Sequence, residues 1–219
     1  MVTCLCALNN IFDNKSLILC SGSANLDGRI LIWNVFEQTT SSVKLKGHTG
    51  NITAITSLGD GRTLASTAHD GNIVLWDTLT GEEIFKILAH SSMVTALRYS
   101  LSKKCLFSAG WDSNIKIWSV VSAGVNDGYV KKTLNLEKVI LSETPIINIL
   151  MRQVKGNYVV SIGANNTIQV WNTETGELEG SFVSVDNTRA EVCLLENKFK
   201  YGKADFTTLN TAVKEDIVG

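Results

Sequence analysis

This 219-residue sequence contains little histidine and almost no proline, and neither sign of charge is in large excess. The chain has three histidines, one proline, and 20 basic side chains against 21 acidic ones, which leaves a formal net charge of −1. This balance excludes a global attraction for nucleic acid or an anionic membrane, without excluding a local patch. Because proline is nearly absent, the 17 glycines must form most of the turns.

The cysteines follow neither a disulfide nor a metal-binding pattern. Their number is odd and no Cys-x-x-Cys pair is present, which favours a reducing, intracellular location, either cytoplasmic or nuclear. The N-terminal MVTCLCALNN lacks a basic flank and a long apolar run, so we expect no signal peptide. No segment is apolar for long enough to cross a bilayer. The cysteines are Cys4, Cys6, Cys20, Cys105 and Cys193.

The most informative feature is a sequence pattern that occurs twice. STAHDGNIVLWD (66–77) and SAGWDSNIKIWS (108–119) both run from Ser through Asp to Trp and lie 42 residues apart. Such a period of about 40–45 residues decides the architecture of the whole chain. The tryptophans that mark the repeat, at spacings of 43, 42 and 53 residues, are Trp33, Trp76, Trp118 and Trp171.

Other residues keep fixed offsets from these tryptophans. Six residues before them stand Asp27, Asp70, Asp112 and Asn165, and ten residues before the last three stand Ser66, Ser108 and Ser161. His48 and His90 each lie 22 residues before their Asp, and Glu143 takes that place in the fourth unit. In the first unit the Ser is Ser21 or Ser23, depending on hairpin length, and the His would fall before Met1.

Each unit also has the pattern of four short strands joined by tight turns, as in 51–58, 62–67, 72–77 and 82–88. A sheet of this size buries its faces only against neighbouring sheets, so the sequence predicts an all-β propeller of four-stranded antiparallel blades. We place four clear blades at about 1–46, 47–88, 89–141 and 142–183, which together form the propeller domain 1–183. Residues 184–219 are assigned to a degenerate fifth blade or a C-terminal extension.

The repeated polar residues would converge within each blade. Asp lies in the turn between the second and third strands, Trp ends the third strand, Ser lies on the second, and His precedes the first. His can then donate to the carboxylate, and Ser can bridge the imidazole and the indole.

These residues resemble the WD-repeat family of β-propellers. The resemblance covers about residues 1–183 and rests on Gly47-His48 with Trp76-Asp77, and on Ala89-His90 with Trp118-Ser119. It implies two structural hydrogen-bonded tetrads, in which Glu143 and Asn165 are departures in the fourth unit. The tetrads are His48, Ser66, Asp70 and Trp76, and His90, Ser108, Asp112 and Trp118.

Four repeats do not complete a ring of seven blades, which would need about 300 residues. We therefore expect an incomplete ring, completed by missing blades or by another chain. The start at Val2, on a blade's innermost strand, supports an incomplete ring. We favour a fragment of a longer protein over a natural partial propeller, because exposed blade faces would present apolar patches from residues such as Ile146, Ile147 and Val192. The extra residues before Trp171 are assigned to a long surface loop at 122–132 (SAGVNDGYVKK).

Catalysis has little support, because the blade network uses two of the three histidines and no Gly-rich phosphate loop precedes a helix. We predict no catalytic residue, no cofactor and no metal. Protein recognition fits better, because the residue before each turn Asp and the residues three and five positions after each His project from one rim. In the WD-repeat family this rim frequently docks partners. The predicted rim residues are Asn51, Thr53, His69, Met93, Thr95 and Trp111.

The sequence therefore predicts a non-catalytic protein-interaction scaffold of an intracellular multiprotein complex, with Trp111 either a partner anchor or packed over its own hairpin. An alternative is an RNA- or ribonucleoprotein-associated propeller, which requires Lys103-Lys104, Lys131-Lys132 and 198–203 to converge on one face. A ubiquitin-ligase substrate adaptor is a further alternative. Family members with that role typically carry Arg two residues after Trp-Asp, and Thr78-Leu79 follow here.

Overall fold

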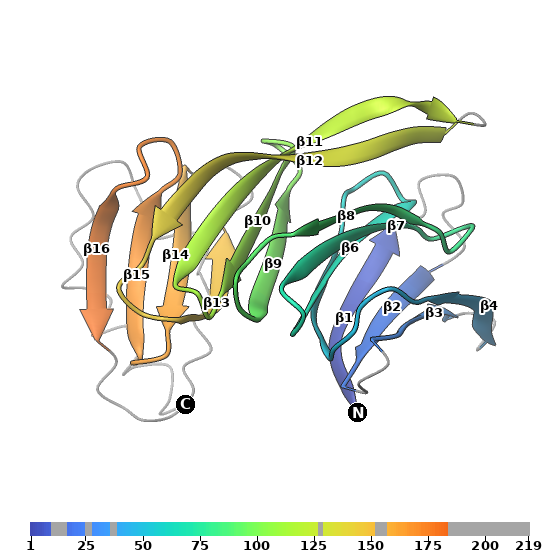
Figure 1. Cartoon of the computed structure of the whole chain (residues 1–219), viewed down its shortest axis with the longest axis horizontal. Coiled ribbons are helices and arrows are strands. Elements are labelled where there is room, and N and C mark those ends of the chain that lie inside the picture. The colour runs from blue at the N-terminus through green and yellow to red at the C-terminus, as the bar shows by residue number, and fades with distance from the viewer. Residues whose placement is uncertain (10–16, 25–27, 36–38, 127–128, 152–156, 184–219) are drawn as a thin grey trace, which may run out of the picture. The chain divides into compact units, whose positions relative to one another are not determined.

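The computed structural model of the chain describes residues 1–9, 17–24, 28–35, 39–126, 129–151 and 157–183. These residues contain strands and no helix. The strands form four separate four-stranded antiparallel sheets, each built from strands that are consecutive in the chain (Figure 1). The predicted all-β architecture of antiparallel blades is confirmed. The fifth blade or extension at 184–219 lies outside the described residues.

Each sheet is one blade, numbered here in chain order. Blade 1 comprises β1 (Val2–Asn9), β2 (Leu17–Ser23), β3 (Ile30–Asn34) and β4 (Thr39–Leu45). Blade 2 comprises β5 (Ile52–Ser57), β6 (Thr63–Ala68), β7 (Asn72–Asp77) and β8 (Glu83–Leu88). Blade 3 comprises β9 (Val94–Ser100), β10 (Cys105–Gly110), β11 (Asn114–Asn126) and β12 (Tyr129–Leu141). Blade 4 comprises β13 (Ile146–Met151), β14 (Tyr158–Gly163), β15 (Thr167–Asn172) and β16 (Leu178–Val183).

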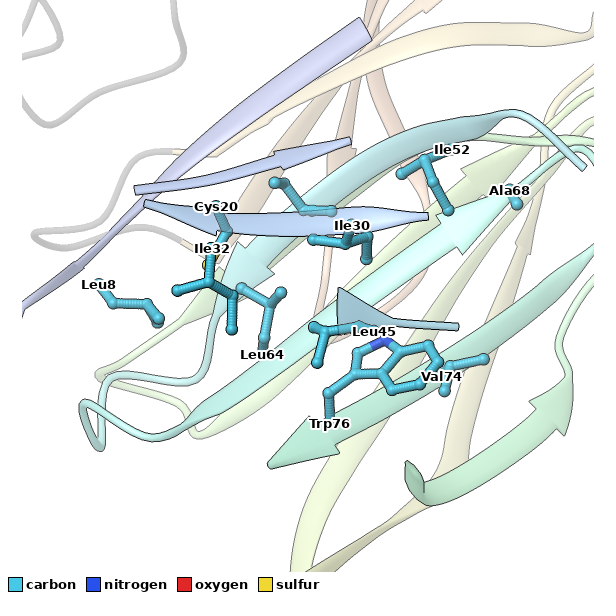
Figure 2. Close-up of a cluster of buried hydrophobic side chains, with 11 residues drawn as sticks. Leu8, Cys20, Ile30, Ile32, Leu45, Ile52, Leu64, Ala68, Val74 and Trp76 are labelled. Atoms are coloured by element: carbon cyan, nitrogen blue, oxygen red, sulfur yellow. The ribbon is translucent and has the colours of Figure 1, made fainter. Parts of the chain in front are cut away.

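Neighbouring blades bury their apolar faces against each other. Side chains alternate between the two faces of a strand, so each blade offers one face to the blade before it and the other to the blade after it. Trp76 packs in a cluster with Leu8, Ile30 and Leu45 of blade 1 (Figure 2). Trp118 joins Ala65 and Leu75 of blade 2 in a second cluster. The Trp of each later blade is thus buried against the blade before it.

Trp171 repeats this arrangement in a third cluster, with Phe107 and Ile117 of blade 3. Trp33 of blade 1 differs, because it is 38% exposed where Trp76 is fully buried. None of the core clusters of the described residues contains side chains from both blade 1 and blade 4. The four blades therefore do not close into a ring.

The first strands of successive blades lie side by side, and threonine hydroxyls link them. Thr3 Oγ1 donates to the carbonyl of Ile52 at 2.6 Å, and Thr95 Oγ1 donates to the carbonyl of Ile146 at 2.6 Å. The chain thus joins blade 1 to blade 2, and blade 3 to blade 4, by the same side chain at the same place.

Gly71 positions the turn after β6 against the loop that enters blade 3. Its φ is +76°, a conformation that side chains with a Cβ rarely adopt. A Cβ at this position would lie 2.6 Å from the carbonyl oxygen of His90. The carbonyl of Gly71 accepts hydrogen bonds from the N–H groups of Ala89 and His90, both at 3.0 Å. This close approach brings the polar turn of one blade next to the entry loop of the next.

The loop interpretation of residues 122–132 was wrong. β11 and β12 continue beyond the end of β10 as a two-stranded hairpin, with Val121 opposite Thr133 and Asn126 opposite Tyr129 (Figure 1). Gly124, which suggested a loop, has a φ of +117° and lies where the register shifts between Ser122 and Val125. A glycine inside a strand is typical of such a bulge, so the alternating residues on either side were the better guide.

Candidate functional site

A chain of four side chains crosses blade 2 from Trp76 to Asp70. Trp76 Nε1 donates to Ser66 Oγ at 2.7 Å, and Ser66 Oγ lies 2.8 Å from His48 Nε2. His48 Nδ1 lies 3.1 and 3.0 Å from the two carboxylate oxygens of Asp70. The imidazole of His48 and the hydroxyl of Ser66 are buried, and the hydrogen bonds among the four side chains satisfy their polar atoms inside the blade.

Blade 3 repeats the same geometry. Trp118 Nε1 donates to Ser108 Oγ at 2.9 Å, Ser108 Oγ lies 2.7 Å from His90 Nε2, and His90 Nδ1 lies 2.8 and 3.0 Å from the Asp112 oxygens. The structure thus brings together both sets of four residues that the sequence offsets selected.

The hydrogen-bond partners of His90 determine which of its ring nitrogens carries the hydrogen. A carboxylate only accepts, so His90 Nδ1 carries the hydrogen and donates it to Asp112. Nε2 then accepts from the hydroxyl of Ser108, whose oxygen accepts from the indole. Burial lowers the pKa of His90 and outweighs the opposing effect of Asp112, which keeps the imidazole neutral at pH 7.

The turn aspartates are held as anions. Burial alone would raise the pKa of Asp70, but hydrogen bonds from His48 and from the N–H groups of Thr49 and Asn72 hold that pKa far below its ordinary value. The same competition lowers the pKa of Asp112, where burial is outweighed by His90 and Asn114. Each carboxylate therefore organises the end of its blade by accepting several hydrogen bonds at once.

Blades 1 and 4 keep only part of this network. In blade 1, Trp33 Nε1 donates to Ser21 Oγ at 2.8 Å, so the structure selects Ser21 over Ser23; Asp27 lies outside the described residues. In blade 4, Trp171 Nε1 donates to Ser161 Oγ at 2.8 Å. Asn165 accepts from the N–H and hydroxyl of Thr167 instead of from an imidazole.

The predicted rim lies at the end of the blades where the turn aspartates are. The N–H of His69 donates to the carbonyl of Asn51 at 3.0 Å, and the N–H of Trp111 donates to the carbonyl of Met93 at 2.9 Å. These backbone bonds fix the two exposed rings, His69 and Trp111, beside the start of their blade's first strand. The equivalent bond in blade 4 joins Ala164 to Pro145 at 2.8 Å, so blade 4 presents only a methyl group there.

Two predicted rim residues have other partners. Thr53 Oγ1 lies 3.1 Å from Thr67 Oγ1 in the same blade, and Thr95 Oγ1 donates to the carbonyls of Ala109 and Ile146. Asn51 and Met93 are half-buried, and the Asn51 Oδ1 is buried without a hydrogen-bond partner among the described residues. The most accessible rim surface is therefore that of His69 and Trp111, the latter 49% exposed.

A shallow hollow of about 120 Å³ adjoins this rim between blades 2 and 3. It is lined by His69, Leu88, Ser91 and Ser92, together with the paired groups Asp70 and His90. Leu88 was not predicted as a rim residue, because an apolar side chain on a strand suggests the core. Its exposure of 69% shows that it belongs to the surface. Among the described residues, no Lys or Arg lines the hollow, and none is a predicted rim residue.

Two negative findings concern the described residues. No cluster of three or more His, Cys, Asp or Glu side chains among them has a geometry that could hold a metal ion. No helix suited to crossing a membrane occurs in that part of the chain.

Buried Trp–Ser–His–Asp chains on small antiparallel sheets, repeated every 42 residues, define the blades of a β-propeller. The family described as "WD domain, G-beta repeat" matches residues 39–77 and 81–119, which include all eight residues of the two tetrads. The chain therefore carries two repeats of the WD-repeat family, at 39–77 and 81–119.

Relatives with different assigned roles share this repeat. "Periodic tryptophan protein 2 homolog" of Dictyostelium discoideum is 32% identical over 50% of this chain and 12% of its own length. "Pre-mRNA-splicing factor cwf17" of Schizosaccharomyces pombe is 26% identical over 73% of this chain and 43% of its own. "Autophagy-related protein 16" of Arabidopsis thaliana is 26% identical over 81% of this chain and 32% of its own. The chain thus spans less than half of each of these relatives.

Proposed function

We propose that the chain is a non-catalytic scaffold that binds another protein through its rim. The rim is formed by His69, Trp111, Asn51 and Met93, and the hydrogen-bonded hydroxyls of Thr53 and Thr95 stabilise the strands beneath it. The observation that carries this proposal is Trp111, a half-exposed indole whose backbone is held by the carbonyl of Met93. Tryptophans that are rigidly presented at a surface are frequent hot spots of protein–protein interfaces.

The charge of the rim supports a protein partner. Asp70 and Asp112 are both nearly buried and paired with a histidine, so their charges face inward. The hollow that adjoins the rim is lined by the imidazole of His69, the side chain of Leu88 and the serines Ser91 and Ser92. An aromatic and aliphatic surface with neutral polar groups suits the desolvated centre of a protein interface better than a phosphate track.

An RNA- or ribonucleoprotein-associated role is the second candidate, and it rests on the likeness to a pre-mRNA-splicing factor. In that role the scaffold would bind a protein of the ribonucleoprotein. Both candidates imply an intracellular location, cytoplasmic or nuclear. Binding measured at 50 and 200 mM salt separates direct RNA contact from protein contact, because phosphate contacts weaken steeply with salt.

The rim is tested with Trp111→Ala and a matched control, Leu136→Ala, which removes an exposed apolar side chain from the outer strand β12. Proteins captured by the wild type and by each variant are quantified by mass spectrometry, and thermal unfolding is recorded in parallel. We expect Trp111→Ala to lose specific partners with almost unchanged melting temperature, while Leu136→Ala keeps them. A large fall in melting temperature with unchanged capture would make Trp111 a packing residue and overturn the proposal.

A further inference from the structure

A groove separates blades 3 and 4 at the end of the strands opposite to the rim. It encloses about 480 Å³. Its floor is formed by the buried side chains of Phe107 and Ile117 and by the half-buried Cys105. Lys103, in the turn between β9 and β10, and Thr173, after β15, face it from the two blades.

Two lysines bridge this groove through neutral oxygens. Lys103 Nζ donates to Thr173 Oγ1 at 2.9 Å, and Lys138 Nζ donates to the carbonyl of Glu174. Neither ammonium group forms an ion pair within the described part of the chain. The carboxylates that line the groove, Glu137 and Glu174, are exposed and belong to the outer strand β12 and the outer turn of blade 4.

The equivalent space between blades 2 and 3 is filled by this chain itself. Val120 and Leu134, on the two strands of the long hairpin β11–β12, pack into the cluster that contains Leu58 and Leu75 of blade 2. Thr173 has the place of Val120, since both stand two residues after the Trp of their blade. Blade 4 has only a tight turn between β15 and β16, so no residue of the described part of the chain takes the place of Leu134.

The two grooves differ in the charge of the turn that joins the first and second strands of the preceding blade. In the filled groove, Lys132, two residues before Leu134, contacts the carboxylate of Asp60 in the turn between β5 and β6. In the open groove, the residue aligned with Asp60 is Ser102, and Lys103 and Lys104 follow it. The filled groove therefore pairs with a basic side chain of the hairpin, whereas the open groove would pair with an acidic one.

We propose that the groove between blades 3 and 4 binds a β-hairpin of a partner protein, with an aliphatic side chain on Phe107 and Ile117. An Asp or Glu two residues before that side chain pairs with Lys103 and Lys104. The hairpin β11–β12 on blade 2 is the internal precedent for this mode, in which the apolar side chain supplies burial and the charge supplies specificity.

The test uses cyclic hairpin peptides with the sequence of residues 119–136, either unchanged or carrying Lys132→Asp. Binding to the full chain is titrated by fluorescence anisotropy, and the rate of Cys105 alkylation, mapped by mass spectrometry, reports whether the groove is filled. We expect the acidic peptide to bind about fivefold more tightly than the basic one and to slow Cys105 alkylation in proportion to occupancy. An acidic peptide that also carries Leu134→Ser should lose both effects.

Matched protein variants locate the binding site. Lys103→Glu should reverse the preference to the basic peptide, while Lys131→Glu makes the same charge change on the exposed hairpin and should leave the preference unaltered. Trp111→Ala on the opposite end should also bind normally, which separates this site from the rim. Equal binding of both peptides, or binding that leaves the alkylation of Cys105 unchanged, would overturn the proposal.

Discussion

Lys132 of blade 3 and Asp60 of blade 2 are 72 residues apart in the sequence, and the ammonium group of the first contacts the carboxylate of the second. Asp60 also accepts hydrogen bonds from the N–H and the hydroxyl of Thr63, at 2.7 and 2.5 Å. Burial alone would raise the pKa of Asp60, but Lys132 and Thr63 outweigh it and lower that pKa below its ordinary value of 3.8. This contact ties the extended hairpin to the neighbouring blade.

Removing the lysine should weaken the tie without unfolding the blades. Lys132→Met keeps the aliphatic stem, and we expect a loss of up to about 1 kcal/mol at pH 7, because the pair is partly exposed. Since the pKa of Asp60 is lowered by folding, the contribution is complete well above pH 3.8 and disappears as the pH falls below that value. Urea unfolding at pH 7 and pH 3 measures this difference. Lys131→Met is the control, and an equal loss for both variants would contradict the assignment.

The tetrad aspartates should contribute more than the surface pair. Asp70→Ala leaves His48 Nδ1 and two backbone N–H groups without their acceptor, and Asp112→Ala does the same in blade 3. We expect each variant to lose about 1–3 kcal/mol of unfolding free energy in chemical denaturation. A loss no larger than that of an exposed substitution such as Glu174→Ala would show that the network does not stabilise the blades.

Acid should destabilise blade 3 in two windows. Folding lowers the pKa of His90 below its ordinary value of 6.5, so its contribution is complete above that pH and is lost as the pH falls from there through the lower, folded pKa. Folding also lowers the pKa of Asp112, so a second loss occurs below pH 3.8. Urea midpoints between pH 8 and pH 2 test this. The variant His90→Gln should lack the first loss, and an identical profile for this variant would exclude His90 as its source.

Blade 4 offers a gain of stability. Glu143 and Asn165 take the places of the missing His and Asp, Ser161 is buried beside Trp171, and the Thr144 hydroxyl is buried without a partner among the described residues. The double variant Glu143→His with Asn165→Asp should complete the network and add about 1 kcal/mol, more than the two single variants together. Thermal unfolding of all three variants measures this coupling. Additive or negative effects would mean that the backbone of blade 4 does not admit the imidazole.

The face of blade 1 that carries Trp33 should promote association. Val2 and Leu5 are 57% and 64% exposed, and the equivalent faces of the other blades are covered by the preceding blade. Contiguous apolar surfaces of this kind drive self-association or binding to a further blade. We expect the average mass of the 219-residue chain in sedimentation velocity to rise with concentration, and Leu5→Glu to reduce this rise. A monomer at every concentration would contradict this expectation.

The sequence by itself determined what lies within one blade. The offsets between His48, Ser66, Asp70 and Trp76 select side chains that meet on one sheet, because strands joined by short turns leave little freedom in their pairing. The same reasoning selected His90 and Asp112, and it predicted the rim from the residue before each turn Asp. It left a choice open where a turn length was unknown, as with Ser21 and Ser23, and the structure decides this choice because the hydroxyl of Ser21 reaches the indole of Trp33.

Only the tertiary structure decided the relations between blades. The sequence around Gly124 looks like a loop, and the hairpin exists because Leu134 and Lys132 find partners on blade 2, more than fifty residues away in the chain. Thr95 is a predicted rim residue, and only the structure shows that its hydroxyl also donates to the carbonyl of Ile146 in the next blade. The groove at Cys105 depends on the length of a turn in blade 4 and on the charge of a turn in blade 3. Such contacts arise from packing between sheets, so the local pattern of apolar and polar residues does not predict them.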